Sequence, residues 1–175
     1  LEQSEEPIII IDEFKTLVKY IPSIGTADIV LPEGIEAIAN EAFALNENKK
    51  IEFKTIHLPK SLRYIEPGTF AGINTLEKIT VDNDNVCFTE QNGVLFGCKK
   101  TSYIGCVVSD DNKEIEAIIC YPAGKIDIKA FAMPPEVIYV EKYAFSGSRL
   151  ETIKAKNKNL IIGDKAFDNC VKLKT

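Results

Sequence analysis

The sequence predicts a β-dominated solenoid, in which short parallel strands stack along one face and an irregular wall closes each coil. The prediction rests first on a repeat, because three prolines are each followed eleven residues later by a phenylalanine. These pairs are Pro32 and Phe43, Pro59 and Phe70, and Pro134 and Phe145. A fourth copy lacks the proline and leads to Phe167. Self-similarity of this kind is the signature of a repeat architecture.

Further positions of the repeat agree between the copies. An aliphatic residue lies five positions before each phenylalanine, at Ile38, Ile65, Val140 and Ile162. A leucine follows three of the phenylalanines after five or six residues, at Leu76, Leu150 and Leu173. This agreement favours a true repeat over an ordinary β-rich domain in which the spacings coincide.

Each coil is expected to contribute one very short strand. In the segments 29–31, 56–58 and 79–81, two aliphatic residues flank one residue that points the other way. A proline directly after the first two strands ends the pairing, because it cannot donate to a sheet ladder. The phenyl rings fill the interior. Since no single coil could bury that face alone, stability comes from the stacking of neighbouring coils.

The repeat follows the pattern Leu-Pro-x-x-(Ile/Leu/Val)-x-x-Ile-x-x-x-Ala-Phe-x-x-x-x-Leu-x-x-Ile. This pattern resembles the BspA-like leucine-rich repeat family of bacterial surface proteins, and the likeness covers most of residues 29–175. The resemblance implies a leucine-rich repeat solenoid, a right-handed coil with parallel strands on its concave face and an irregular or 3-10 outer wall. Cys170 lies where that family often has a cysteine.

Length and composition suit one domain, since 175 residues that are 45% hydrophobic can form a continuous elongated core. We expect residues 1–28 to form a polar lead and a capping hairpin, with 14–20 and 28–32 as the arms of the hairpin. The acidic start lacks the basic region of a signal peptide and is interpreted as a tether. Residues 29–175 are expected to form the repeat domain, with repeats near 29–55, 56–78, 79–133, 134–152 and 153–175.

The third repeat is the longest and is expected to carry a projecting antiparallel β-hairpin insertion near residues 93–121. Its β-rich runs, at 94–96 and 115–121, are separated by polar turn residues. The resemblance implies an insert of this kind, although residues 98–113 are longer than such loops usually are. Features specific to this protein are therefore expected in the insertion.

Charge and hydropathy exclude several classes of partner. The formal net charge is −5 and the sequence has no basic cluster, which argues against nucleic acids and anionic membranes. No apolar run approaches the roughly 20 residues of a membrane-spanning helix. The sequence also lacks a phosphate-binding loop, a dinucleotide-binding motif and a nucleophile elbow. We therefore expect no cofactor and no enzymatic activity.

The cysteines show no metal-binding pattern. There are five, at Cys87, Cys98, Cys106, Cys120 and Cys170. They form neither a C-x-x-C pair nor a zinc spacing. Two interpretations stay open: small buried hydrophobic residues, or a Cys98–Cys106 disulfide that staples the insertion in an oxidising compartment. The acidic stretch 82–85 is interpreted as a turn, because Gly93 stands where a calcium loop needs a glutamate.

With no catalytic constellation in the sequence, function is expected at the surface. Five residues should point outward from the strands of the concave face: Val30, His57, Thr80, Ala132 and Lys154. Two tyrosines of the insertion, Tyr103 and Tyr121, are added because tyrosines are frequent at interfaces. His57 is interpreted as an exposed side chain, since nothing in the sequence supplies a nucleophile and an orienting group beside it.

The resemblance implies a cell-surface or secreted interaction module of the adhesion type, which binds a protein or glycan outside the cell, with host extracellular matrix among the candidate ligands. A second hypothesis is a structural spacer that has no ligand of its own. A third is an enzyme that uses His57 or a cysteine, which requires a perturbed titratable group in a cleft. Because no cap is recognised at the C-terminal coil, weak self-association is also expected.

Overall fold

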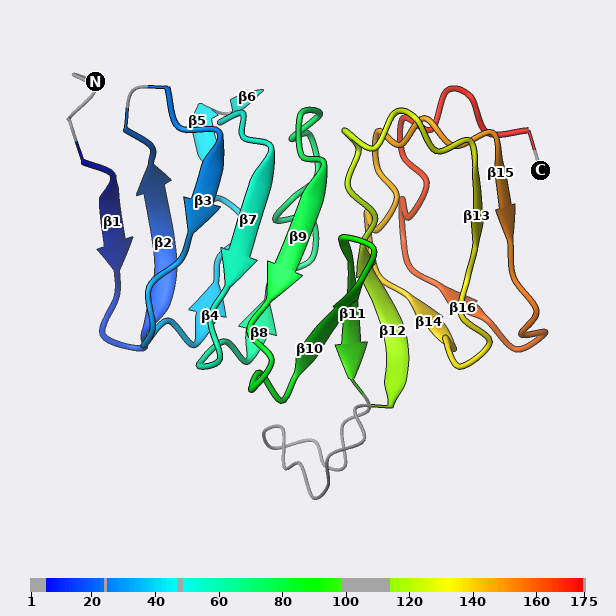
Figure 1. The fold of residues 1–175 in the computed structure, drawn as a ribbon, viewed down its shortest axis with the longest axis horizontal. Coiled ribbons are helices and arrows are strands. Elements are labelled where there is room, and N and C mark those ends of the chain that lie inside the picture. The colour runs from blue at the N-terminus through cyan, green and yellow to red at the C-terminus, as the bar shows by residue number, and fades with distance from the viewer. Residues whose placement is uncertain (1–5, 24, 47–48, 99–113, 175) are drawn as a thin grey trace.

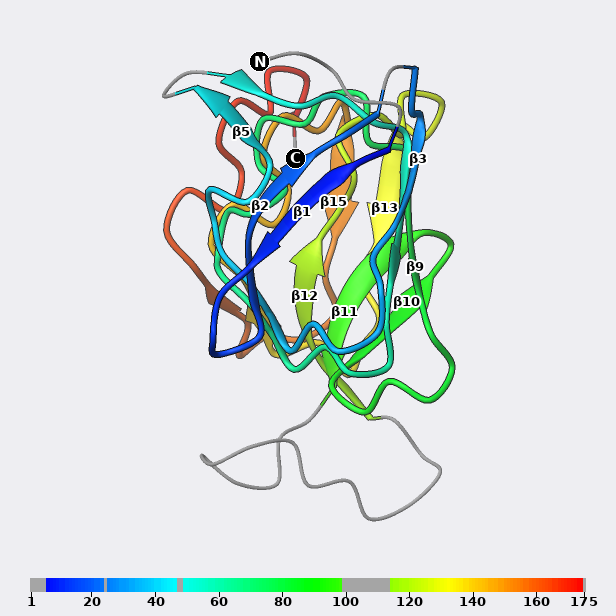
Figure 2. The same cartoon turned by 90° about the vertical axis from the view of Figure 1, so that its left-hand side faces the viewer.

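The computed structural model describes residues 6–23, 25–46, 49–98 and 114–174. Within these ranges the chain forms sixteen β-strands and no helix, and hence no helix that could cross a membrane. The strands follow one another along the longest axis of the molecule (Figure 1). Seen from the N-terminal side, successive coils lie behind one another (Figure 2). The predicted solenoid is confirmed.

One side of the solenoid, here called the front ladder, consists of short parallel strands from successive coils. β3 pairs with β7 and β7 with β9, and further along β13 pairs with β15. The register aligns Ile29, Ile56 and Ile79, which are all buried. Residues next to them in the strands face outward, as the alternation predicts. The strands are β3 (Asp28–Val30), β7 (Thr55–Leu58), β9 (Lys78–Val81), β13 (Ala130–Ala132) and β15 (Thr152–Lys154).

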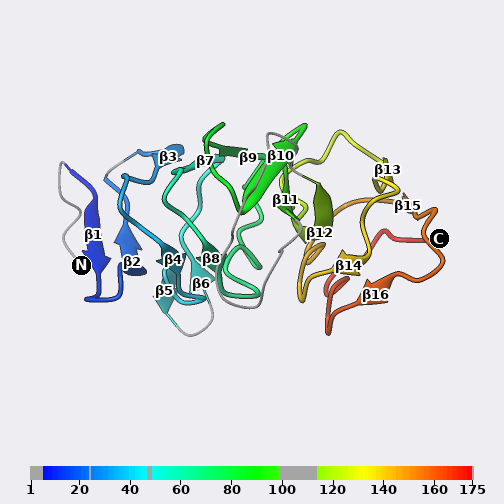
Figure 3. The same ribbon diagram turned by 90° about the horizontal axis from the view of Figure 1, so that it is seen from below.

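A back ladder of mostly two-residue strands lies on the opposite side (Figure 3). It aligns the aliphatic residues that precede each repeat phenylalanine, among them Ile38 with Ile65 and Val140 with Ile162. An irregular wall was predicted on this side, and the short parallel pairing is an addition to that prediction. The strands are β2 (Thr16–Ile21), β4 (Ala37–Ile38), β8 (Tyr64–Ile65), β12 (Ile115–Cys120), β14 (Tyr139–Val140) and β16 (Ile161–Ile162).

A wall of consecutive turns leads from the back ladder to the front ladder. In one coil the N–H groups of Ala144, Ser146 and Ser148 each donate to the carbonyl three residues earlier, at 3.0, 2.9 and 2.9 Å. The chain has positive φ two residues before and two residues after three of the repeat phenylalanines. These positions are Gly68 and Gly72, Tyr143 and Gly147, and Lys165 and Asn169.

Stacked aromatic rings fill the interior in two separate columns. Phe43 and Phe70 stack with ring centroids 5.9 Å apart. Tyr121 stacks on Phe145 at 5.6 Å, and Phe145 on Phe167 at 5.3 Å. The buried residues likewise fall into two hydrophobic clusters, which share no residue. The core is therefore divided along the solenoid.

The division is a seam at which both ladders are interrupted. Among the described residues, β9 does not pair with β13, and β8 does not pair with β12. An antiparallel hairpin of β10 (Phe88–Gln91) and β11 (Val94–Cys98) fills the seam, and β11 also pairs with β12. Since Leu95 joins the first cluster while Val94 and Phe96 join the second, β11 is buried on both faces. Here residues 6–86 are called the first block and 114–174 the second block.

In each block an antiparallel partner strand lies beside the first strand of the back ladder. β1 (Ile8–Ile11) pairs with β2 in the first block, and β11 pairs with β12, the first strand of the second block. The backbone N–H of Tyr20 donates to the Ala42 carbonyl at 2.8 Å, and that of Tyr121 to the Ala144 carbonyl at 2.7 Å. The two tyrosines therefore occupy equivalent positions.

The arms predicted for the N-terminal hairpin are wrong in one respect. Residues 28–30 belong to the front ladder, and the other arm is Ile8–Ile11, which was expected in a tether. The run of four isoleucines explains the difference, because β-branched residues favour strands.

The predicted insertion is only partly a projection. β11 and β12 are antiparallel, but β11 lies within the body of the protein. Residues 99–113, the remainder of the predicted projection, lie outside the described residues. A small second hairpin, β5 (Ala44–Asn46) with β6 (Lys49–Lys50), extends the wall of the first block.

Candidate functional site

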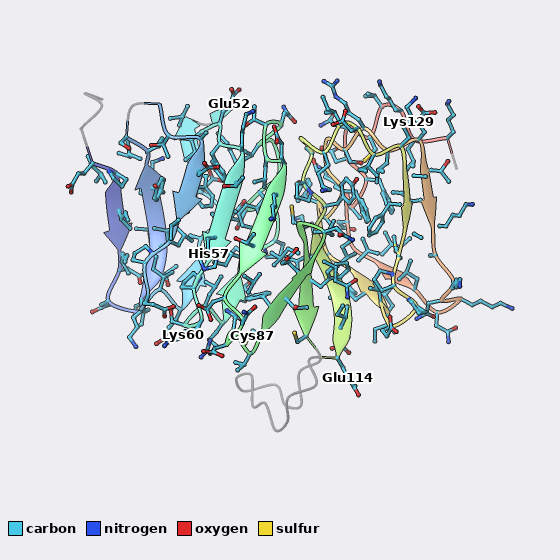
Figure 4. All side chains as sticks on the ribbon, in the orientation of Figure 1. Glu52, His57, Lys60, Cys87, Glu114 and Lys129 are labelled. Carbon is cyan, nitrogen blue, oxygen red and sulfur yellow. The ribbon has the colours of Figure 1, made fainter. Side chains whose placement is uncertain are left out.

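Three of the predicted binding residues lie side by side on the front ladder of the first block. The register pairs Val30 with His57, and His57 with Thr80. Val30 is 68% exposed, and His57 lies near the middle of the front ladder (Figure 4). His57 Nδ1 lies 2.9 Å from Thr80 Oγ1, at hydrogen-bonding distance. The residue before each of these three in its strand is a buried isoleucine. The packed sheet therefore holds this row of side chains in a fixed arrangement.

A second outward row runs beside the first, two residues earlier on each strand. It consists of Asp28, Thr55 and Lys78, which are in register. Thr55 Oγ1 donates to Asp28 Oδ1 at 2.6 Å. The two rows, together called the front surface, present aliphatic, imidazole, hydroxyl, carboxylate and ammonium groups. Such a mixture suits apolar contact and hydrogen bonding to a protein better than a single ionic ligand.

The structure does not bring the other two outward positions to the front surface. Ala132 pairs with Lys154 on β13 and β15, and the seam separates these strands from β9. The five positions predicted as one row therefore form two groups. The cause is the β10–β11 hairpin, which lies between the two parts of the front ladder (Figure 1).

Tyr121 is not the exposed anchor that the sequence analysis predicted. Its side chain is only 2% exposed, and its ring packs edge-on against Phe131 with centroids 5.2 Å apart. Burial raises the pKa of its hydroxyl to about 12. The residue takes the place of a repeat phenylalanine in the core. Tyr103 lies outside the described residues.

The predicted disulfide between Cys98 and Cys106 is wrong, because Cys98 does not form a disulfide. Cys98 is a buried thiol, at the end of a strand that is buried along its whole length. The disulfide-bonded cysteine of this hairpin is Cys87, whose carbonyl accepts a hydrogen bond from the Cys98 N–H at 2.9 Å. Cys106 lies outside the described residues.

Two titratable groups, one buried and one partly buried, lie close to the seam. Burial raises the pKa of the Cys120 thiol to about 12, with partial opposition from Lys50. Such a thiol is protonated at neutral pH and is a poor nucleophile. Lys50 Nζ donates to the carbonyls of Gly68 and Thr69 at 2.9 and 2.8 Å, and burial lowers its pKa. Lys50 thus links the walls of successive coils.

The described residues contain no group of three or more His, Cys, Asp or Glu suited to a metal ion.

A pocket that the sequence did not predict lies at the seam, beside β13. Its volume is about 350 Å³. The turn of the β10–β11 hairpin, Asn92 and Gly93, has positive φ at both residues. An Asn-Gly pair between β-rich runs is a strong hairpin signal, so the sequence could have located this hairpin. The pocket itself arises from segments far apart in the chain and has no local signal.

Comparison with known proteins identifies the repeat. A family model described as the BspA-type leucine-rich repeat region, in six copies, matches residues 23–121 and 113–175. No curated protein matches the sequence significantly.

Two solved structures are similar in fold. The pneumococcal vaccine antigen PcpA superposes with a TM-score of 0.60 at 24% identity, over 85% of this chain and 38% of that one. A leucine-rich repeat protein from Eubacterium ventriosum superposes with a TM-score of 0.57 at 21% identity, over 85% of this chain and 52% of that one. This chain therefore spans about half or less of the length of either structure.

Proposed function

Since this chain belongs to the BspA-type leucine-rich repeat family, we propose that it is a non-enzymatic interaction module of the cell surface or of secreted material, of the adhesion type. Its ligand is a protein or a glycan-bearing protein, with host extracellular matrix as the first candidate. The proposal places the binding site on the front surface.

The observation that carries the proposal is the exposure of Val30 beside the His57 and Thr80 side chains on a rigid parallel sheet. An aliphatic side chain that is 68% exposed and flanked by hydrogen-bonding groups can supply apolar contact area within a polar rim, as in protein interfaces. Solenoids build extended binding surfaces from such repeated outward positions.

The similar structures support an extracellular location. PcpA is described as a vaccine antigen, and an antigen that antibodies reach lies outside the cell.

The test is a binding screen of the 175-residue chain against immobilised extracellular matrix proteins and glycans, by surface plasmon resonance. A Val30→Lys variant should bind the hit at least about tenfold more weakly, because it places a charge at the centre of the contact. The matched control is Ile161→Lys on β16 of the back ladder, which is 60% exposed and receives the same charge. It should bind like the unchanged chain.

Equal binding by all three proteins would contradict a site on the front surface. A further variant, in which residues 98–113 are replaced by a short glycine-containing turn, tests the insertion. Binding lost only in that variant would assign recognition to the insertion.

A structural spacer is the second candidate, because polar groups of the front surface satisfy one another. Thr55 bonds to Asp28, and His57 lies at hydrogen-bonding distance from Thr80. A surface that needs no ligand to satisfy its polar groups suits a spacer. The absence of any hit in the screen would favour this function.

A further inference from the structure

The seam pocket lies between the β10–β11 hairpin and the second block, and no residue of the front surface lines it. Three segments form it: the tip of the β10–β11 hairpin, the loop after Tyr121, and β13. Its volume, about 350 Å³, is within the range of pockets that hold small organic ligands. The pocket is therefore large enough for more than a single water molecule.

The wall of the pocket is mainly apolar. Val94 and Phe96 come from β11, Phe131 comes from β13, and Ile128 and Pro134 flank it. Ile128 is 44% exposed although it is a large aliphatic residue. Val94 and Phe96 are already buried, so an apolar group in the pocket would remove mainly the exposed surface of Ile128 from water, which favours binding.

One polar group of the wall lacks a partner. In the described part of the chain, the Tyr121 hydroxyl is the one buried side-chain oxygen or nitrogen that makes no hydrogen bond. Tyr121 lines the pocket, but its hydroxyl oxygen is itself shielded from water. A ligand in the pocket does not reach this hydroxyl, so the polar contacts of a ligand come from exposed groups of the lining.

The lining residues carry one positive charge and no negative charge. Lys125 Nζ is held by the Asn92 carbonyl at 2.9 Å, and no carboxylate lines the pocket. The acidic residues closest in sequence are directed elsewhere or exposed: Glu90 accepts the Gly93 N–H at 2.7 Å, and Asp127 is exposed. In a chain of net charge −5, this local excess of positive charge favours an anionic ligand.

We propose that the seam pocket binds a small organic carboxylate with an apolar body, whose carboxylate meets Lys125 while the body lies against Ile128 and Phe131. The same chemistry is found in a free aryl- or alkyl-carboxylate and in the C-terminal residue of a peptide that ends in an apolar side chain. This site is independent of the front surface.

The experiment is an NMR titration of the 15N-labelled 175-residue chain with four probes. The first pair is 4-phenylbutyrate and its neutral isostere 4-phenylbutan-1-ol. The second pair is the tripeptide Gly-Gly-Phe with a free carboxylate and the same tripeptide as its C-terminal amide. The carboxylates should give saturable shifts at the amides of Asn92, Lys125 and Ala132, with dissociation constants of roughly 1 mM, as is typical of ligands of this size.

The neutral probes should bind about tenfold more weakly, because a charge-assisted hydrogen bond is lost. If the tripeptide is the tighter carboxylate, the source is a peptide C-terminus, and if 4-phenylbutyrate is tighter, the source is a free acid.

Variants of exposed residues locate the site. Ala132→Trp should abolish the shifts by filling the pocket. Ala130→Trp is the matched control, because Ala130 is also exposed and lies on the same strand and face but does not line the pocket. Lys125→Gln should weaken the carboxylates about tenfold and leave the alcohol unchanged. It is the second variant if Ala132→Trp loses its amide dispersion.

Two results would overturn the proposal. One is the absence of saturable shifts with either carboxylate at about 10 mM, a concentration well above the expected dissociation constant. The other is binding that Lys125→Gln and Ala132→Trp leave unchanged. Neither result depends on whether a matrix ligand of the front surface exists.

Discussion

Tyr20 and Tyr121 occupy equivalent positions in the two blocks, and they differ in the surroundings of the side-chain hydroxyl. Both are buried, both donate their backbone N–H to an alanine carbonyl, and both rings contact a repeat phenylalanine. The ring centroids are 6.1 Å apart for Tyr20 and Phe43 and 5.6 Å apart for Tyr121 and Phe145. Within the described chain, the Tyr121 hydroxyl alone is buried without a partner.

This difference predicts opposite effects of the same substitution. Tyr121→Phe removes the unpaired hydroxyl and should raise the free energy of unfolding by about 1 kcal/mol. Tyr20→Phe, the matched control, should leave it unchanged or lower it. Urea denaturation followed by circular dichroism measures both. A stability loss in Tyr121→Phe would show that its hydroxyl has a partner, such as a buried water.

At the residue level, the sequence predicted well which side of a strand a side chain points to, and poorly whether that side chain is buried. The alternation within each strand correctly placed Val30, His57 and Thr80 outward, because a strand has a fixed side-chain period. Tyr121 was misplaced because its segment lacks the Ala-Phe signature, so that its role as a member of the aromatic stack was hidden.

At the level of elements, the repeat predicted the front ladder but not the strands that join the blocks. β10 and β11 do not follow the repeat, and β1 lies before its first copy. β1 and β10 each pair with the next strand in the chain. The contact between the blocks instead joins segments far apart in the sequence, since the Gly124 N–H donates to the Leu76 carbonyl at 2.7 Å across the seam.

Gly124 is predicted to be essential for this contact. A Cβ at Gly124 would lie 2.7 Å from the backbone oxygens of Leu76 and Thr75, so Gly124→Ala should lower the free energy of unfolding by about 2 to 3 kcal/mol. The control is Gly72→Ala, which has no atom within 4 Å of the added carbon but a φ of +82°. It should cost only about 1 kcal/mol, from the backbone conformation.

Thermal denaturation of the two variants is the measurement. If Gly124→Ala were no more destabilising than Gly72→Ala, the seam would tolerate separation of its backbones. The close approach would then contribute little to holding the blocks together.

At the level of the whole molecule, two cores meet at β11 and β12, which each contribute side chains to both. Sequence reasoning predicted a continuous core, because four copies of the repeat suggest one uninterrupted stack. The interruption is a tertiary feature: Leu95 packs in one block while its neighbours Val94 and Phe96 pack in the other. A short run of apolar residues indicates a buried strand, but it does not indicate which of two cores each side chain packs into.

The seam also sets how stability depends on pH. The pKa of Cys120 is raised by burial from 9.0 to about 12, and that of Tyr121 from 10.0 to about 12. Below pH 9 both groups are protonated in the folded and unfolded states. As the pH rises from about 9 to about 12, the unfolded chain loses these protons first, so the stability that they contribute is lost. Lys50 acts in the opposite direction, because its pKa is lowered by burial.

We therefore predict that the free energy of unfolding falls between about pH 9 and pH 12, by up to about 4 kcal/mol from Cys120 alone at about 1.4 kcal/mol per pKa unit. Urea denaturation at fixed temperature across this range measures the decline. Cys120→Ala should flatten it, whereas Cys170→Ala, which changes a partly exposed thiol, should leave the slope unchanged. If both variants decline as steeply as the unchanged chain, the Cys120 thiol does not control alkaline unfolding, and the seam is more open to water than its burial indicates.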